Sequence, residues 1–202
     1  MISIKPSEMS ERDNYKFLIG SIIPRPVAVV SSVSSEGVVN IAPFSYFNIV
    51  TSNPPIISLG IQRKNGVMKD TTRNILENKE AVVHIADEDN IEDINETAAN
   101  LKHDESELDR TRWTLSPAEE IKVPLLNELK IKMEVSLYQH IPIDDEGSVT
   151  ADLLLLRVEK YHIQENLYQD GRINPDLLKP MSRLAGNDYG KLGERVRIAR
   201  PE

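Results

Sequence analysis

Runs of apolar residues, interrupted by short polar turns, predict that most of this chain folds into β-strands. Residues 27–33 are rich in β-branched side chains, residues 34–37 have turn-forming composition, and apolar character resumes at 38–41. This pattern predicts a β-hairpin. A third strand is expected at 56–61, and it begins after two prolines, which have no amide hydrogen to donate to a neighbouring strand.

The second half of the chain has the clearest alternation. Between Leu129 and Tyr138 every second residue is apolar, and the residues between them, Glu134 included, are predicted to face solvent. Further strands are expected at 81–86 and 148–162. Strands joined by short turns, with helices only at the periphery, favour a mainly β protein built on a closed antiparallel β-barrel.

Two helical segments and one anchored loop complete the expected fold. Asp70 or Thr71 is expected to cap a helix that runs to about Glu77, since either side chain can accept a hydrogen bond from a free amide of the first turn. Residues 87–109 are acidic and weakly amphipathic, which predicts a solvated helical excursion on the outside of the barrel. Apolar residues at intervals within 113–126 predict a loop that is tied down before the next strand.

The length of the chain, 202 residues, suits a single domain with its own hydrophobic core. We expect the core at about 15–165 and a C-terminal strap at 166–202. Cysteine is absent, which excludes disulfides, thiolate nucleophiles and cysteine-ligated metal sites, so any redox chemistry must belong to a bound cofactor. No apolar run approaches the roughly 20 residues that cross a bilayer, and no apolar signal core follows Met1, so a cytoplasmic location is expected.

The formal net charge of −8 argues against nucleic acid or a membrane surface as the main partner, because these polyanions repel an acidic protein. One segment departs from this balance. Arg63, Lys64, Lys69 and Arg73, offset only by Asp70, place a net charge of +3 within eleven residues. An ordinary solvated loop is one explanation, and an anion-binding site is the other.

Several common catalytic and cofactor motifs are absent. The sequence contains no G-x-G-x-x-G dinucleotide fingerprint and no G-x-S-x-G nucleophile elbow. The segment 186–192 resembles a phosphate-binding P-loop, but it is one residue too short between its glycines and ends in Leu192 in place of Ser or Thr. The histidines lack metal-ligand spacing, so no metal site is expected; they are His84, His103, His140 and His162.

Four short blocks, in a fixed order, carry the most specific signal. They are Asn-Ile-Ala-Pro-Phe-Ser-Tyr-Phe-Asn at 40–48, Ser-Leu-Gly at 58–60, Lys-Asp-Thr-Thr-Arg-Asn at 69–74 and Arg-Leu-Ala-Gly-Asn-Asp-Tyr at 183–189. These blocks resemble the flavin reductase-like family, the FMN-binding split barrels that include flavoredoxins and the reductase components of two-component monooxygenases. Ala185 departs from the family pattern, which commonly has a second glycine there, and this leaves the geometry of the C-terminal tail open.

The resemblance implies an FMN site along these blocks. Residues 42–48 are expected to line the isoalloxazine ring, with backbone amides and the Ser45 hydroxyl near its pyrimidine edge and N5, where polar donors stabilise charge on the reduced ring. Core packing is the alternative role for Phe44 and Phe47. The implied residues of this part of the site are Asn40, Ala42, Pro43, Phe44, Ser45, Phe47, Asn48, Ser58 and Gly60.

The FMN phosphate is assigned to the cationic segment. Arg63, Lys64, Lys69 and Thr71 are its candidate ligands, because guanidinium, ammonium and hydroxyl donors can converge with the amides of a helix N-terminus on one dianion. Arg73 lies inside the predicted helix and is left out of the set.

Arg25, Arg183 and Tyr189 are further cofactor-binding candidates. Arg25 lies between two prolines that keep the backbone extended, and we expect it to reach the cofactor or a subunit contact. Arg183 and Tyr189 belong to a tail that closes over the flavin or nicotinamide pocket, or that packs on the barrel as a plain strap. Asn40 and Asn48 hold the ribityl chain or the ring through their amides, or stabilise a turn.

By resemblance, the expected activity is that of an NAD(P)H-dependent flavin reductase. Hydride passes from NADH or NADPH to flavin N5, and the electrons leave to free flavin, oxygen or an electron-accepting protein. No side chain need act as an acid or base, so no catalytic residue is assigned. The family also implies a homodimer with FMN near the interface. Two alternatives stay open: a flavoredoxin-type carrier with permanently bound FMN, and a non-catalytic flavin-binding module.

Overall fold

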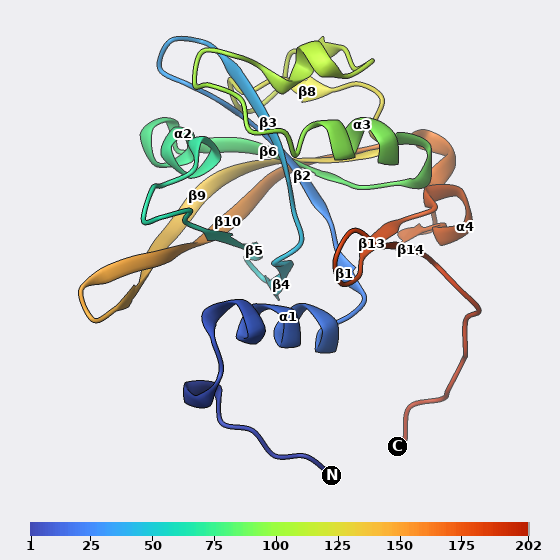
Figure 1. The fold of residues 1–202 in the computed structure, drawn as a ribbon. Helices are drawn as coiled ribbons and strands as arrows, with labels where there is room; N and C mark the ends of the chain where they lie inside the picture. Colours follow the sequence, from blue (N-terminus) through green and yellow to red (C-terminus); the bar gives the residue numbers. More distant parts are fainter. Residues whose placement is uncertain (202) are drawn as a thin grey trace.

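Seven strands form the main sheet of the computed structural model, which describes residues 1–201 (Figure 1). Their order in the sheet is β3-β2-β6-β9-β10-β5-β4. Every pair of neighbours is antiparallel. The strands span Ala28–Val33 (β2), Val39–Phe44 (β3), Phe47–Ser52 (β4), Pro55–Gln62 (β5), Glu80–Ile85 (β6), Ile131–Asp145 (β9) and Ser148–Ile163 (β10).

The prediction of a mainly β fold is confirmed, whereas closure of the barrel is not. Across residues 1–201, the hydrogen-bonded order of the sheet has β3 and β4 as its two edges. These strands follow each other in the chain and are joined at Ser45 and Tyr46. Pro43 of β3 has no amide hydrogen to donate to a further strand. The sheet is therefore split beside this turn.

The largest hydrophobic core lies on one face of the sheet. Val30 of β2, Leu59 of β5 and Val83 of β6 are buried there, and helix α2 (Asp70–Asn78) adds Ile75. Phe44 and Phe47 belong to the same core. Core packing is thus confirmed as a role of both phenylalanine rings.

The opposite face of the sheet is also covered. Val29 and Ile41 pack there against Ile94 and Trp113. Burial on both faces explains why Ala28, Val29 and Val30 of β2 are successive apolar residues. The covering segment is helical, as expected, but Ile94 is fully buried, so the segment is not merely solvated. Its helices are η2 (Glu88–Asn90), α3 (Ile91–Glu96) and η3 (Glu107–Arg110).

Glu134 of β9 is fully buried, so the prediction that it faces solvent is wrong. The loop that contains β7 (Leu115–Ser116) and β8 (Leu125–Leu126) crosses this face of the strand. Backbone amides of residues 119, 120 and 121 donate to the Glu134 carboxylate at 2.9, 2.7 and 3.1 Å. The predicted alternation along β9 is correct, but a strand pattern does not show that a loop covers the polar face.

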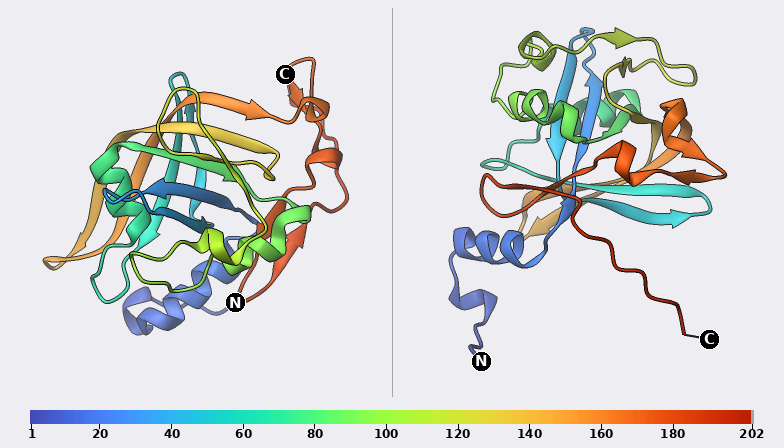
Figure 2. Two further views of the ribbon diagram at one scale, coloured as in Figure 1. Left: turned by 90° about the horizontal axis from the view of Figure 1, so that it is seen from above. Right: turned by 90° about the vertical axis from the view of Figure 1, so that its right-hand side faces the viewer.

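An N-terminal helix, α1 (Glu11–Ser21), is not predicted by the apolar pattern. It follows a single helical turn, η1 (Pro6–Glu8), and lies beside the β3–β4 end of the sheet (Figures 1 and 2). Ser10 caps the helix, because its hydroxyl oxygen accepts from the amide of Asp13 at 3.1 Å. Within α1 only Ile19 is buried.

Helix α2 begins one residue earlier than predicted. Its N-cap is Lys69, whose side chain makes no capping hydrogen bond, so neither Asp70 nor Thr71 is the cap. The Asp70 carboxylate instead pairs with Arg73 at 2.5 Å and with His103 at 2.9 Å. The first amides of the helix therefore have no side-chain cap, a point that matters for the site below.

The C-terminal strap forms a small second sheet. β1 (Arg25–Pro26) pairs with β13 (Met181–Arg183), and β13 pairs with β14 (Tyr189–Lys191). The register places Arg25 opposite Arg183. The other elements of the strap are η4 (Glu165–Leu167), β11 (Tyr168–Gln169), β12 (Arg172–Ile173) and α4 (Pro175–Leu178). None of the helices within residues 1–201 has the length and apolar character needed to cross a membrane.

Candidate functional site

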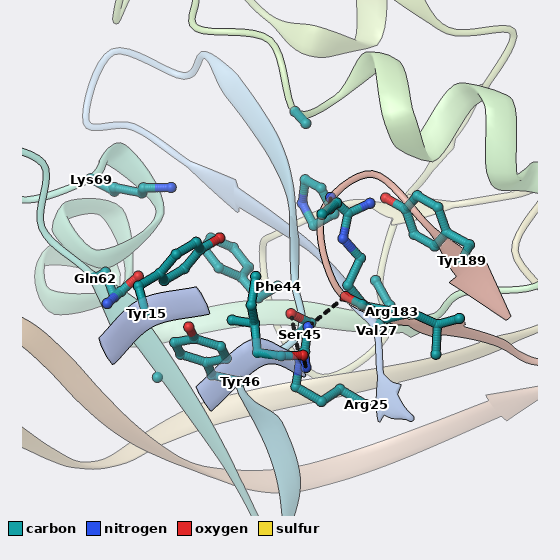
Figure 3. A pocket seen from close by; sticks show the side chains of 16 residues that line it. Tyr15, Arg25, Val27, Phe44, Ser45, Tyr46, Gln62, Lys69, Arg183 and Tyr189 are labelled. Atoms are coloured by element: carbon teal, nitrogen blue, oxygen red, sulfur yellow. Dashed lines mark hydrogen bonds between the residues drawn. The ribbon is translucent and has the colours of Figure 1, made fainter. Parts of the chain in front are cut away.

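A cavity of about 390 Å³ lies where the β3–β4 turn, the end of β5, helix α1 and the β13–β14 hairpin meet (Figure 3). Lys69 lies toward one end of the cavity in the figure, and Arg183 and Tyr189 lie toward the other. The structure brings half of the predicted cofactor residues to its wall: Arg25, Pro43, Phe44, Ser45, Gly60, Lys69, Arg183 and Tyr189.

A second cavity of about 1030 Å³ adjoins the first, and the two share wall residues such as Ser45 and Tyr46. It runs between α1 and strands β4, β5 and β10. Four predicted residues line this second cavity but not the first: Phe47, Asn48, Ser58 and Arg63. Four others line neither of the two cavities: Asn40, Ala42, Lys64 and Thr71.

Lys69 is one of the cations on the cavity wall that have no carboxylate partner among residues 1–201. Its ammonium lies 5.7 Å from the centre of the Phe44 ring. No carboxylate within residues 1–201 forms an ion pair with it, and burial, aided by the charge of Lys64, lowers the pKa of Lys69. An ammonium group on a cavity wall that lacks a counter-ion is suited to bind an anion.

Polar side chains hold the first turn of α2 against β2 and β3. The amide of Asn40 donates to the Thr71 hydroxyl at 2.9 Å, and that of Asn74 donates to the Ser32 hydroxyl at 3.1 Å. Asn40 and Thr71 therefore contact each other rather than the two cavities. Thr72, one residue further, is fully buried, and its hydroxyl has no partner among the described residues. Thr72 lines neither cavity, so its hydroxyl does not face a ligand there. The uncapped amides at this helix N-terminus are the donors that suit a phosphate.

Arg63 is bound to a neighbouring carboxylate. Its Nε and Nη2 atoms donate to Asp152 at 2.9 and 2.8 Å, and His140 lies 2.9 Å from the same carboxylate. Burial raises the pKa of Asp152, but the hydrogen bonds from Arg63 and His140 outweigh it and hold that pKa below its usual range. Two of the five guanidinium N–H donors of Arg63 are thus already used within the protein.

Arg183 stacks on Tyr189 at the hairpin end of the cavity. The guanidinium carbon lies 4.4 Å from the ring centre, and Nη2 donates to the carbonyl of Gly186 at 2.7 Å. Gly186 has a φ of 60°, the left-handed conformation that glycine adopts at little cost. The hairpin turn is thereby fixed with its cation over an aromatic face.

Tyr46 lines the cavity within the predicted 42–48 block, whereas Tyr15 and Gln62 are among the lining residues that the sequence predictions miss. Tyr15 comes from α1, and the Ser-x-x-Asp cap at Ser10 is the signal that could have found this helix. Burial raises the pKa of Tyr46. With Phe44 and Tyr189 these rings give the cavity four aromatic side chains (Figure 3), a lining suited to a planar heterocycle.

Gly60 permits the close approach of β5 to the β3–β4 turn. Its amide donates to the Tyr46 carbonyl at 2.7 Å, and a Cβ at this position would lie 3.3 Å from the Cβ of Tyr46. A side chain here would push the turn away from β5, so the cavity depends on this glycine.

The sequence matches the flavin reductase like domain over residues 19–176. YwrF of Bacillus subtilis (strain 168) is 50% identical over 206 residues, which cover 100% of both chains. BH2278 of Halalkalibacterium halodurans is 43% identical, with 99% of this chain and 97% of that protein covered.

Solved structures show the same fold. Nitrilotriacetate monooxygenase component B from Bacillus cereus has 54% identity and a TM-score of 0.96, with 98% of each chain covered. The 2-nitrobenzoate 2-nitroreductase NbaA of Pseudomonas fluorescens has 29% identity and a TM-score of 0.89, with 99% of this chain and 96% of that chain covered. The flavoredoxin of Desulfovibrio vulgaris (Miyazaki F) has 20% identity and a TM-score of 0.74, and it shares the fold alone. The match covers 88% of this chain and 92% of the flavoredoxin. The chain belongs to the flavin reductase-like family.

Proposed function

We propose that the protein is an FMN-dependent oxidoreductase, an NAD(P)H-dependent flavin reductase. The observation that carries this proposal is Lys69, a cation without an ion-pair partner among residues 1–201, on the wall of a cavity lined by aromatic side chains. FMN combines the two features that this wall would complement, a planar ring system and a terminal phosphate dianion.

The residues present fit FMN at both ends. At the phosphate end, the ammonium of Lys69 and the uncapped amides of α2 provide donors. At the ring end, Phe44, Tyr46 and Ser45 provide aromatic faces and a hydroxyl. Arg63 enters this scheme as a support of the neighbouring strand, because its donors go to Asp152.

Bound FMN would supply the redox chemistry, because the chain contains no cysteine that could do so. The protein's part is to bind the ring, to keep Ser45 and the turn amides beside it, and to leave room for the nicotinamide donor. The adjoining cavity of about 1030 Å³ provides that room, because its wall is continuous with the flavin cavity at Ser45 and Tyr46. No side chain is needed as a general acid or base.

A homodimer forms part of the proposal. Helix α1 and strand β4, which flank the site, expose large apolar side chains: Phe17, Leu18 and Ile22 on or just after the helix, and Ile49 and Val50 on the strand. Apolar side chains gathered beside a site indicate a surface that another chain covers. A second copy seated on this surface would bury it and complete the wall of the flavin cavity.

Anaerobic titration of the purified protein tests the function. We expect a yellow protein, or one that becomes yellow with added FMN, whose absorbance near 450 nm is bleached rapidly by NADH or NADPH. Bleaching only in the presence of an electron-donating protein would favour a flavoredoxin-type carrier. Bound flavin that no donor reduces would favour a non-catalytic flavin-binding module, and failure to bind FMN would contradict all three functions.

A further inference from the structure

Arg25 occupies an unusual position at the ring end of the site. It is only 7% exposed, and it lines both cavities. Its guanidinium Nη1 donates to the carbonyl oxygens of Ile19, at 2.7 Å, and Ile22. Nη2 donates to the carbonyl of Leu184 at 2.8 Å, and Nε lies 3.5 Å from the Ser45 hydroxyl. One residue therefore joins α1, the β13–β14 hairpin and the β3–β4 turn.

The charge of Arg25 is not cancelled by a carboxylate. None of the ion pairs among residues 1–201 includes it, whereas Arg63, Arg73, Arg110, Arg112 and Arg195 all have acidic partners. Its acceptors are neutral carbonyl groups. Those of Ile19 and Ile22 stand at the C-terminus of α1, where the helix dipole places about half a negative charge. A substantial positive charge thus remains at a buried point on the cavity wall.

We infer that Arg25 sets the reduction potential of the bound flavin while it fixes the walls of its cavity. This inference rests on the proposed function. Reduction by two electrons and one proton leaves one more negative charge on an isoalloxazine ring at neutral pH. A buried cation on the cavity wall stabilises that charge and so raises the potential. Arg25 is 7% exposed, so its charge is screened less than a charge at the surface would be.

If the role of Arg25 were purely structural, its variants would behave differently. If Arg25 acts only as a cap for α1 and a tie for the hairpin, what matters is its planar fork of donors rather than its charge. Lysine keeps the charge but loses the fork, and glutamine loses both. The pair of variants Arg25→Lys and Arg25→Gln therefore separates charge from architecture.

The experiment measures the two-electron potential of bound FMN by equilibration with a reference dye, alongside the thermal unfolding midpoint of each protein. We expect the potential of the wild-type complex to lie above that of free FMN. Arg25→Gln should shift the equilibrium toward oxidised flavin at least tenfold, which is about 30 mV for two electrons. Arg25→Lys should keep the wild-type potential, although both variants unfold at lower temperature.

Arg112→Gln is the control, because Arg112 pairs with Asp93 at 2.7 Å and lines neither cavity. Its potential should equal that of the wild type. An unchanged potential in flavin-loaded Arg25→Gln overturns the inference, as does an equal loss in the lysine and glutamine variants. If Arg25→Gln fails to fold, the wild-type protein alone provides the test. A potential of its bound FMN below that of free FMN would also overturn the inference. A wild-type protein that binds no flavin contradicts the proposed function itself.

Discussion

Arg63 and Asp152 form a bidentate ion pair, with Nε and Nη2 of the guanidinium 2.9 and 2.8 Å from the two carboxylate oxygens. The pair links the end of β5 to the start of β10, and Asp152 is fully buried. Charge clustering in the sequence includes Arg63 among the phosphate ligands. The partner that uses its donors lies 89 positions away along the chain, beyond what local composition reveals.

Replacing Arg63 with Met should destabilise the protein, because it leaves the buried Asp152 carboxylate with His140 as its remaining side-chain partner. Urea unfolding measures the effect. The double variant Arg63→Met/Asp152→Leu should recover most of the loss, since no unpaired charge then stays buried. A double variant as unstable as the single one would show that the pair is not the source of the effect.

Lys69→Met should weaken FMN binding by about 1 to 3 kcal/mol while riboflavin binding changes little, because only FMN carries the phosphate. Fluorescence titration with both flavins measures the two affinities. Lys64→Met is the control, since Lys64, unlike Lys69, lines neither cavity. Equal weakening of FMN and riboflavin by the Lys69 variant would place the phosphate elsewhere.

The apolar pattern locates most of the sheet and part of the site. β2, β3, β5, β6, β9 and β10 all overlap predicted strands, since alternating or β-branched runs report directly on burial. β4 is missed, because the 40–48 block is read for its cofactor chemistry rather than as a strand. Helix α1 is missed by the sequence prediction. Only Ile19 of this helix is buried within the single chain, so its apolar residues do not form the regular buried stripe by which a helix is recognised.

Long-range contacts account for what the sequence does not show of the site. The blocks around Ser45, Gly60, Lys69 and Arg183 do meet at one cavity. Asn40 and Thr71, in the same blocks, bind each other instead, and this depends on how α2 lies on β3. Spacing along the chain cannot decide which residues of a polar block face the cavity and which face a neighbouring element.

Glu134→Gln should destabilise the protein by about 1 to 3 kcal/mol, since an amide side chain would direct N–H groups at some of the three backbone amides that the carboxylate now accepts. Burial raises the pKa of Glu134, but the hydrogen bonds from the backbone amides and from His162 outweigh it and keep that pKa below its usual range. Glu120→Gln, which removes only an exposed contact with Lys160, should change stability by less than about 0.5 kcal/mol. Thermal unfolding of the variants at pH 7 provides the comparison, and equal effects would contradict the buried role.

Phe17→Glu or Ile49→Glu should convert the proposed dimer to monomers, because each places a charge within an apolar interface. The two side chains are 61% and 76% exposed in the single chain, so neither change disturbs its core. Light scattering after size exclusion measures the mass. Tyr168→Glu, on β11 in the strap, is the control and should leave the mass unchanged. Wild-type protein with the mass of one chain would exclude the dimer.

His84 should make the protein less stable as the pH falls below about 6.5. The imidazole is fully buried, Nδ1 lies 2.9 Å from the Val29 carbonyl, and Nε2 accepts from the Leu126 amide at 3.1 Å. Burial lowers the pKa of His84 to about 3, from an ordinary value of 6.5. Between these two values the unfolded chain binds one more proton than the folded protein, so stability is complete above pH 6.5 and falls as the pH approaches 3.

Between these two pKa values, His84 alone changes the free energy of unfolding by about 1.4 kcal/mol per pH unit. His84→Gln isolates it, because the glutamine side chain does not titrate and its oxygen can accept from the Leu126 amide. We expect urea unfolding at pH 7 to favour the wild type, which keeps both hydrogen bonds, and the advantage to shrink steadily as the pH is lowered to 4.5. Stability curves for the two proteins that run parallel across this range would show that His84 is already protonated in the folded protein or that its burial has no energetic consequence.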